Sequence, residues 1–367
     1  MTLTTIQLQR AIALHYLAGV GPKNAKSLIA YAGGLDALFE DRKLHKLDIP
    51  GFSPGRLKAL NKKEALLLAE KELHFIERNN IQTQFYLEEG YPHRLKNCPD
   101  APLLLHSIGN ASTNPQKTIS IVGTRNVSTY GHIIVEELIE ALEPYDVQVV
   151  SGMAYGVDIL AHRACVKHGV STIGVLGHGL DRIYPHQHRS TAQKMIENGG
   201  LFTEFPSGTN PDRENFPRRN RIVAGLTDAT IVIESSLKGG SLITANLAND
   251  YNRDVFAYPG NVFNTYSKGC NALIASNRAH LVTCGADIIQ LLGWEMKENK
   301  AVQRKLYPDL SPDERSVVQS LDEAPETSID VLAVRLKKPI SWLSSTLLTL
   351  ELQGVVMCLP GKKYRLT

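Results

Sequence analysis

The stretch TISIVGTRN, residues 118–126, decides the fold, because a short β-branched run ends there in a glycine turn. The same pattern returns as VQVVSGMAYGVD at residues 147–158. Near-continuous apolar strands that alternate with amphipathic helices are typical of a parallel sheet covered on both faces. The sequence therefore predicts an α/β fold, with an extended Rossmann-like, mostly parallel sheet over residues 116–293.

The elements of this domain follow from the same alternation. We expect strands at 118–122, 147–150, 171–176, 201–203, 229–233, 254–258 and 280–282. Helices are expected at 131–142, 157–167, 190–198, 217–226, 241–251, 272–275 and 287–292.

Residues 1–85 show a helical pattern, with apolar residues spaced three or four apart, and predict an all-α domain. Glycine-containing breaks lie at 18–25 and 49–56. The first fits a helix-hairpin-helix, whose glycine amides can meet a phosphate. Short helices of a sterile-alpha-motif-like bundle need the same glycines merely to turn, so both interpretations stay open. Residues 86–115, rich in proline, are expected to be an extended connector.

The C-terminal part predicts a polar linker at 294–309 and a winged helix at 310–367. Three helical patterns, at 311–321, 328–336 and 340–353, precede a hairpin at 355–366. Its candidate recognition helix, 341–353, carries no arginine or lysine, although phosphate contacts dominate the affinity of such modules. Contact with duplex DNA and contact with a protein therefore both stay open.

The composition of this chain of 367 residues bears on its cellular compartment, on membrane association and on the charge of its partners. Its five cysteines are dispersed and form no zinc-ligand pattern, so we expect neither a bound metal nor a disulfide framework. Dispersed free cysteines are typical of a reducing compartment, so we expect a cytoplasmic location. Nowhere does an apolar run reach the roughly 18 residues that span a membrane, so no membrane association is expected. The net charge is only +3, so attraction to an anionic partner must come from local clusters of charge.

Ligands of open α/β sheets bind at the carboxyl ends of the strands. Glycines and polar residues follow several of the predicted strands, which favours an anion-binding crevice at the carboxyl ends of those strands. For any single strand, a tight turn into the next helix is enough to explain the presence of glycine. The residues concerned are Gly123, Thr124, Arg125, Ser151, Gly152, Lys238, Gly239, Gly240 and Ser241.

Neither a phosphate-binding G-x-x-x-x-G-K-[ST] loop nor a G-x-G-x-x-G turn is present, so no nucleotide cofactor is expected. Asp158 and His162, four residues apart, share one helix face. We expect Asp158 to cap the helix and His162 to pack in the core. Glu204 and Glu234 end strands, where an enzyme could use paired carboxylates, but nothing brings a nucleophile to them. We therefore expect no catalytic residue.

The most basic segment of the chain lies at residues 212–221. Arginine forks bind phosphate oxygens, and Phe216 offers a face on which an unpaired base can stack. The alternative is a solvated helix start, with Phe216 in the core and one arginine paired to Glu204 or Glu214. The DNA contacts expected from this segment are Arg213, Phe216, Arg218, Arg219, Asn220 and Arg221.

Read together, these residues resemble the DNA-processing protein A family, also called DprA or Smf, over nearly the whole chain. The resemblance rests on an ordered series of motifs: residues 121–125, 130–131, 150–158, 161–162, 179–181, 184–185, 203–204, 216–221, 240–245, 259–260 and 269–274.

The resemblance implies a sterile-alpha-motif-like domain, a Rossmann fold and a winged helix. It implies a protein without catalytic activity that binds single-stranded DNA, protects it during natural transformation and loads RecA recombinase, as a homodimer. The single-strand pocket would use Arg125, Arg213, Phe216, the 218–221 run and the 239–241 turn. The family usually has Ser-Gly-Ser where this chain has Gly239-Gly240-Ser241, a change that keeps the amides and the small size but loses one hydroxyl.

Two other functions stay open. One is a nucleotide N-glycosidase of the lysine-decarboxylase-like type, because Gly239-Gly240-Ser241 before a helix and Glu234 are similar to its phosphate-binding motif. The other is a transcription regulator that acts through the winged helix. For the single-strand binder, replacing Arg219 and Arg221 together by alanine is expected to weaken DNA binding without unfolding the protein.

Overall fold

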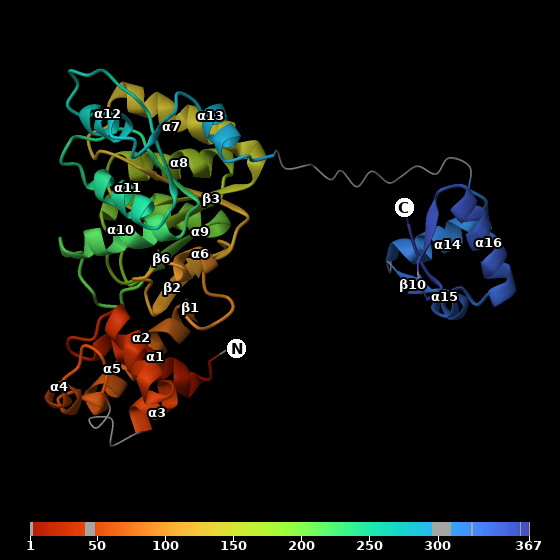
Figure 1. The fold of residues 1–367 in the computed structure, drawn as a ribbon, viewed down its shortest axis with the longest axis horizontal. Helices are drawn as coiled ribbons and strands as arrows, with labels where there is room; N and C mark the ends of the chain where they lie inside the picture. The colour runs from red at the N-terminus through yellow and green to blue at the C-terminus, as the bar shows by residue number, and fades with distance from the viewer. Residues whose placement is uncertain (1–2, 41–47, 296–309, 324–325, 360, 367) are drawn as a thin grey trace. The chain divides into compact units, whose positions relative to one another are not determined.

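The chain forms two compact units, Met1–Lys297 and Glu298–Thr367. The computed structural model describes residues 3–40, 48–295, 310–323, 326–359 and 361–366, and its ribbon is drawn in Figure 1. The first unit holds a helical region followed by a large sheet with its helices. The second unit is small and is described separately below.

Within the described residues, a nine-stranded sheet has the order β1-β2-β6-β5-β4-β3-β7-β8-β9. From β6 to β9 in that order all neighbours are parallel, whereas β2 runs antiparallel to both β6 and β1. The mostly parallel sheet predicted from the sequence is thus confirmed. Its strands are β1 (Gln82–Phe85), β2 (Leu104–Gly109), β3 (Lys117–Val122), β4 (Val147–Ser151), β5 (Thr172–Val175), β6 (Gly200–Thr203), β7 (Ala229–Val232), β8 (Asp254–Ala257) and β9 (His280–Leu281).

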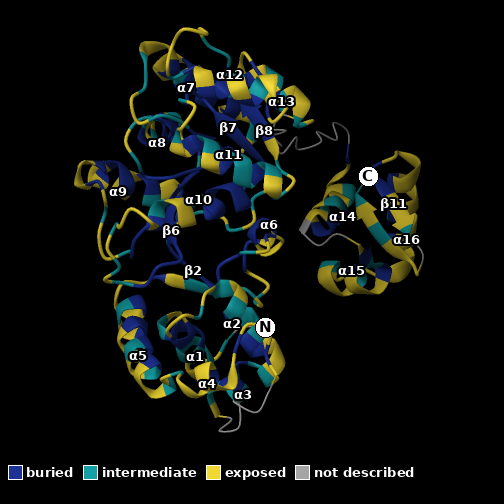
Figure 2. Cartoon of the chain, turned by 60° about the vertical axis from the view of Figure 1, so that its left-hand side comes forward, coloured by how far each residue is buried: buried dark blue, intermediate teal, exposed yellow. Residues whose placement is uncertain are grey.

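Helices cover both faces of the sheet. Successive strand residues point to opposite faces, so Ile121 packs with α7, α8 and α13, whereas Val122 packs with α10, α11 and α12. As a result, the inner strands β4, β5, β6 and β7 are buried throughout (dark blue in Figure 2), whereas both residues of the edge strand β9 are exposed. The helices are α7 (Thr129–Leu142), α8 (Val157–His168), α9 (Arg189–Asn198), α10 (Asn215–Gly225), α11 (Gly240–Asp250), α12 (Lys268–Ala275) and α13 (Gly285–Leu291).

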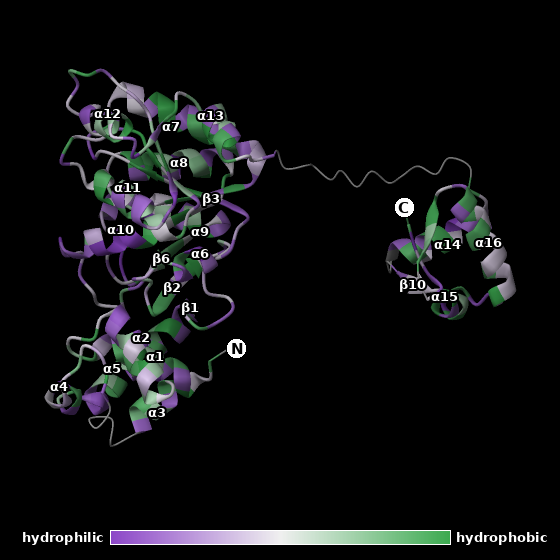
Figure 3. Cartoon of the chain, viewed as in Figure 1, coloured by the Kyte–Doolittle hydropathy of each residue, from purple (hydrophilic) through white to green (hydrophobic). Residues whose placement is uncertain are grey.

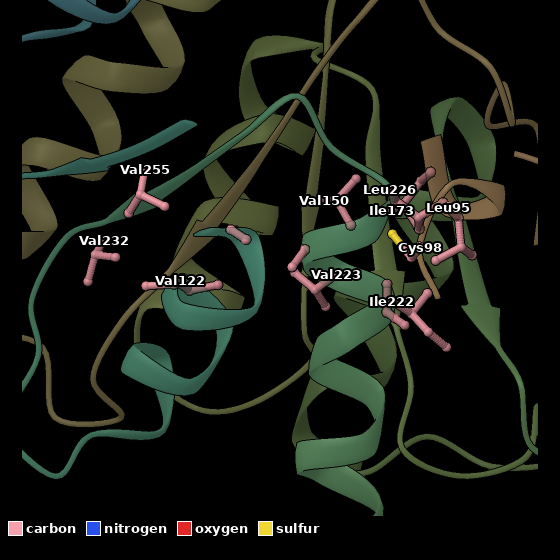
Figure 4. Close-up of a cluster of buried hydrophobic side chains, with 14 of the residues drawn as sticks. Leu95, Cys98, Val122, Val150, Ile173, Ile222, Val223, Leu226, Val232 and Val255 are labelled. Atoms are coloured by element: carbon pink, nitrogen blue, oxygen red, sulfur yellow. The ribbon is translucent and has the colours of Figure 1, made fainter. Parts of the chain in front are cut away.

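Helix α10 is held by its apolar C-terminal half. Ile222, Val223 and Leu226 point into a cluster with Ile173 of β5 and Leu95 of the short helix α6 (His93–Lys96), as Figure 4 shows. The first residues of the helix are mostly hydrophilic (Figure 3). The packing therefore anchors one end of α10 and leaves its N-terminal turns for polar contacts.

The segment predicted as an extended connector is partly built into the sheet. Phe85 pairs with Leu104, and His106 pairs with Thr203 of β6. Because Leu104 and Leu105 are buried, β2 is an inner strand of the sheet rather than a linker. The prediction of a helical region up to residue 85, followed by a connector, is therefore wrong for β1 and β2.

The region before β1 is helical, as predicted, with α1 (Thr5–Tyr16), α2 (Pro22–Ala32), α3 (Leu35–Glu40), α4 (Pro54–Lys58) and α5 (Lys62–Arg78). Arg56 joins its two glycine turns, since it donates to the carbonyl oxygens of Gly19 at 2.6 Å and Gly51 at 3.2 Å. The buried carboxylate of Glu72 accepts hydrogen bonds from the amide and hydroxyl of Ser207. Helix α5 therefore holds the loop that leads toward Arg213.

The second unit is a winged helix, as predicted. Its elements are α14 (Pro312–Glu323), β10 (Thr327–Ser328), α15 (Ile329–Leu336), α16 (Ile340–Leu352), β11 (Val356–Leu359) and β12 (Lys363–Leu366). The three strands have the order β10-β12-β11, and Val317, Leu332 and Leu347 lie in the core. The short strand β10 is not predicted from the sequence. Apart from its first two residues, the predicted linker at 294–309 lies outside the described residues.

In the part of the chain that the structure describes, no helix is both long and apolar enough to cross a bilayer. Nor do three or more His, Cys, Asp or Glu side chains of that part gather as ligands for a metal ion. All five cysteines carry free thiols.

Candidate nucleic-acid-binding groove

A groove of about 680 Å³ lies at the carboxyl ends of β3 and β4, between the first turns of α10 and α11. It is thus at the edge where parallel sheets bind their ligands, next to the point where the strand order reverses, since β3 has β4 on one side and β7 on the other. Of the residues predicted from the sequence, it brings together Gly123, Thr124, Arg125, Gly152, Arg213, Phe216, Arg219, Asn220, Gly239, Gly240 and Ser241.

Two arginines give the groove its accessible charge. Arg125 follows β3 and Arg213 precedes α10, and both are exposed. Neither side chain makes a hydrogen bond or an ion pair with another described residue. Their guanidinium groups are therefore available for phosphate oxygens, which they can bind through two parallel hydrogen bonds.

The N-terminus of α11 forms a second anion-binding element. Gly239 is its N-cap residue and provides no side chain for the unpaired amides of the first turn. Ser241 uses its hydroxyl to donate to the Ser235 hydroxyl at 2.8 Å, which fixes the turn. The free amides and the positive end of the helix dipole therefore face the groove.

An aromatic pair lies on one wall of the groove. The rings of Phe216 and Tyr184 have centroids 6.1 Å apart and planes inclined by 35°. Tyr184 is 48% exposed, and Phe216 rests against Gly177, where a Cβ would lie 3.1 Å from the ring. Tyr184 belongs to the Tyr184-Pro185 motif of the family pattern but is not among the site residues predicted from the sequence.

A smaller cavity of about 70 Å³ adjoins the groove behind Phe216. His178 lines it, and the Nε2 atom of this residue is buried with no partner among the described residues. Burial lowers the pKa of His178, so the ring is neutral near pH 7. Its Nδ1 lies 2.8 Å from the carbonyl oxygen of Gly179, which leaves Nε2 as a hydrogen-bond acceptor.

Arg219 lies on the floor of the groove beside Asp158. It is buried and donates to the carbonyl oxygen of Val175. A Cβ on Gly152 would lie 2.3 Å from both Arg219 Nη1 and Asp158 Oδ2, so only glycine fits between them. Burial raises the pKa of Asp158, and the nearby positive charge of Arg219 opposes that rise. Arg219 is thus a structural cation of the floor rather than a freely moving one.

Four of the predicted residues do not line the groove. Ser151 is fully buried and donates to the carbonyl oxygen of Ile121 at 2.6 Å. Arg221 is buried, pairs with Glu204 and donates to the carbonyl oxygen of Asp100. The interpretation of Ser151 and Arg221 as DNA contacts is therefore corrected, and the alternative of an arginine paired to Glu204 is right for Arg221.

Arg218 and Lys238 are exposed but lie outside the groove lining. The guanidinium of Arg218 lies over the ring of Phe205, 5.1 Å from its centroid. A helix turns by about 100° per residue, which places 218 and 221 on the side of α10 opposite to Phe216 and Asn220. That periodicity is the sequence signal that separates the two pairs.

The carboxylates considered as catalytic are engaged in structural roles. Glu234 accepts hydrogen bonds from the amide of Ser128 at 2.9 Å and from its hydroxyl at 2.6 Å, at the start of α7. Glu204 is the partner of Arg221, and neither carboxylate lines the groove.

His162 has the packing role predicted for it, whereas Asp158 does not cap its helix, because Gly156 is the N-cap of α8 and no side-chain hydrogen bond caps that turn. Asp158, in the first turn of α8, accepts from the amide of Ala154 at 3.3 Å. The buried ring of His162 is hydrogen-bonded to the Gly152 carbonyl at 2.6 Å and the Thr172 hydroxyl at 2.8 Å.

Comparison with known proteins gives concordant matches. Residues 82–293 match the family model of the DNA recombination-mediator protein A, and residues 303–362 match that of the DprA winged helix domain. Protein Smf of Escherichia coli is 35% identical over 305 residues, which are 81% of this chain and 80% of that protein.

Two solved structures are similar in fold. The DNA processing protein A of Streptococcus pneumoniae superposes with a TM-score of 0.63 at 29% identity, over 81% of this chain and all of that chain. The Helicobacter pylori protein superposes with a TM-score of 0.54 at 28% identity, over 59% of this chain and 97% of that one. The Helicobacter structure concerns the single-stranded DNA binding mode of that protein.

Proposed function

Because this chain belongs to the DNA-processing protein A (DprA/Smf) family, we propose that it binds single-stranded DNA in the groove between α10 and α11. The observation that carries the proposal is the convergence of Arg125, Arg213 and the uncapped N-terminus of α11 on one groove. These are two exposed cations and a set of free amides, which together suit successive phosphates of one strand.

The aromatic wall favours a single strand over a duplex. Phe216 and Tyr184 offer ring faces to a base, and only an unstacked base can lie on them. Stacking of this kind tolerates every base, because each base has a π-face. We therefore infer binding with weak sequence preference.

The test is a titration of the full chain with a labelled dT oligomer and with a duplex of equal length. We expect tighter binding to the single strand without added nucleotide, and a loss of affinity as salt rises. Equal affinity for the duplex, or no binding to either, would contradict the proposal.

A matched pair of variants connects the binding to the groove. Replacing Arg213 by alanine removes an accessible cation and should weaken single-strand binding by about 1–3 kcal/mol. Replacing Arg218 by alanine removes an exposed cation on the other side of α10 and should leave affinity unchanged. Equal losses in the two variants would indicate a general charge effect rather than this groove.

We further propose that the protein protects incoming DNA during natural transformation and loads RecA recombinase onto it, acting as a homodimer in the cytoplasm. Support for this step comes from family membership alone. Filament formation by RecA on a strand coated with single-strand binding protein would be measured with and without this chain, and light scattering would give its mass. Unchanged filament formation would contradict RecA loading, and a monomeric mass would contradict the dimer.

We propose a role without catalysis. Both carboxylate oxygens of Glu234, the residue that an N-glycosidase would use, are occupied by hydrogen bonds to Ser128. We expect no free base when the chain is incubated with nucleoside monophosphates. Release of base that is abolished by Glu234→Gln would favour the enzyme instead.

A further inference from the structure

The loop between β8 and α12 is exposed over residues 261–265, beside α12 in Figure 2. Phe263 is 89% exposed and its neighbour Val262 is 64% exposed. Burial of an aromatic ring against a ligand is favourable, because it removes apolar surface from water. The exposed ring of Phe263 is therefore available to a ligand.

Hydrogen bonds within the loop fix its conformation. The amide of Phe263 donates to Asn261 Oδ1 at 2.9 Å, and the amide of Asn264 donates to the Asn261 carbonyl at 2.9 Å. Gly260 and Asn271 close the base of the loop through two hydrogen bonds, at 3.1 and 2.9 Å. The ring is thus held out by an ordered turn, which lowers the entropy lost when a ligand stacks on it.

The loop is joined directly to the wall of the groove. Tyr266 accepts a hydrogen bond from Asn126 Nδ2 at 2.9 Å, and its carbonyl oxygen accepts from the Ser235 amide at 2.6 Å. Asn126 follows Arg125, and Ser235 precedes Ser236, and both Arg125 and Ser236 line the groove. The loop that carries Phe263 is therefore hydrogen-bonded to two segments whose next residues line the groove.

The charge on this side suits a polyanion. Residues 258–276 contain no aspartate or glutamate, and their one charged side chain, Lys268, is exposed. Nothing in the loop thus repels a phosphate backbone that leaves the groove, and Lys268 attracts it. A protein partner, by contrast, would gain only the apolar surface of Phe263 and Val262, because the neighbouring side chains of the loop are polar.

We propose that Phe263 is a second stacking platform, on which a base rests after its strand has left the groove past Arg125. The inference depends on the single-strand binding proposed above and extends it to a site on another loop. Stacking on a single aromatic ring tolerates all bases, so the platform adds affinity and length dependence rather than sequence preference.

The test compares Phe263→Ala with the wild-type chain on dT oligomers from about 4 to about 16 nucleotides, the range of typical site sizes. We expect binding of long oligomers to weaken about 5- to 150-fold, with little change for the shortest ones, which fill the groove alone. Phe263→Tyr keeps the ring and should restore length dependence, whereas Val262→Ala serves as a control that removes apolar area but no ring.

A direct readout comes from Phe263→Trp, because a base stacked on indole quenches its fluorescence. Saturating dT should quench this variant more than the wild-type chain, which contains Trp294 and Trp342. If the wild-type chain binds no oligomer, the proposed function fails. If the wild-type chain binds but Phe263→Ala matches it at every length, or loses affinity equally at every length, the platform is overturned. A change in mass with unchanged DNA binding also overturns it, in favour of a protein contact.

Discussion

Arg221 of α10 and Glu204, just after β6, form an ion pair inside the domain, with side chains only 10% and 4% exposed. The second carboxylate oxygen of Glu204 has no hydrogen-bond partner among the described residues. Glu204 therefore depends on Arg221 for charge compensation. The sequence places Arg221 in a run of arginines that suggests DNA contact, but its partner gives it a different role.

Replacing Arg221 by alanine should lower the free energy of unfolding by about 3–5 kcal/mol, because a buried charge is left unpaired. Urea denaturation followed by circular dichroism would measure this loss. The DNA affinity of the folded fraction should stay unchanged. The expectation that alanines at Arg219 and Arg221 leave the fold intact is thus reversed, since both arginines are buried. A stable variant with weakened DNA binding would show that Arg221 reaches the strand.

Gly156 has a φ of +80°, and a Cβ there would lie 2.2 Å from the Thr124 carbonyl oxygen. Gly156→Ala should cost about 3 kcal/mol or more and weaken DNA binding, since it displaces the backbone next to Arg125. Gly169 is a matched control, with a φ of +70° but no neighbour within 4 Å, and Gly169→Ala should cost only about 1–2 kcal/mol. Thermal denaturation and dT titration of both variants check this, and equal costs would contradict the role of the contact.

The salt dependence of binding should report the accessible arginines. For single strands, log K falls with log salt by about 0.7 for each phosphate contact. Arg125→Ala and Arg213→Ala should each reduce the slope by about that amount, whereas a change of the exposed Lys194 on α9 should not. Fluorescence titrations at several salt concentrations would measure the slopes. Unchanged slopes in both arginine variants would remove them from the backbone contacts.

Stability should fall at mildly acidic pH because of buried histidine. Burial lowers the pKa of His162 from 6.5 to about 4, so the unfolded chain binds a proton more readily than the folded one between these values. The contribution of this ring is fully present above pH 6.5 and is lost at about 1.4 kcal/mol per pH unit as the pH falls toward 4. Urea denaturation between pH 8 and 5 would show this slope.

His106 also makes the protein less stable as the pH falls, since burial lowers its pKa to about 3. His162→Gln should therefore flatten the pH profile only in part. A profile identical to that of the wild-type chain would contradict the assignment to His162, and the exposed His74 provides a control position for the same substitution.

The sheet and most of the groove follow from local sequence pattern. Apolar runs such as 118–122 and 147–150 predict strands because burial on both faces demands continuous hydrophobicity. Gly239 and Gly240 predict an open helix start because they lack capping side chains. These features depend on residues that are close together in the chain, so they can be predicted from a single sequence.

Other features depend on contacts that are distant in the chain. β1 has the sequence Gln-Thr-Gln-Phe, which has no strand pattern of its own and is ordered by pairing with β2. Arg221 meets Glu204 seventeen positions away, and Tyr184, in the loop after β5, meets Phe216 of α10. Helical periodicity separates 218 and 221 from the groove side of α10, but the buried partner of an arginine is known only from the folded structure.

The place of β2 between β1 and β6 determines where the chain can be cut. Removing the residues before 116 would strip β1 and β2 from the sheet and leave β6 with a row of unpaired backbone amides and carbonyls. Such an open edge invites pairing between molecules, and aggregation would follow. A shortened protein that keeps the groove should therefore begin no later than Gln82, the residue at which the family match also begins.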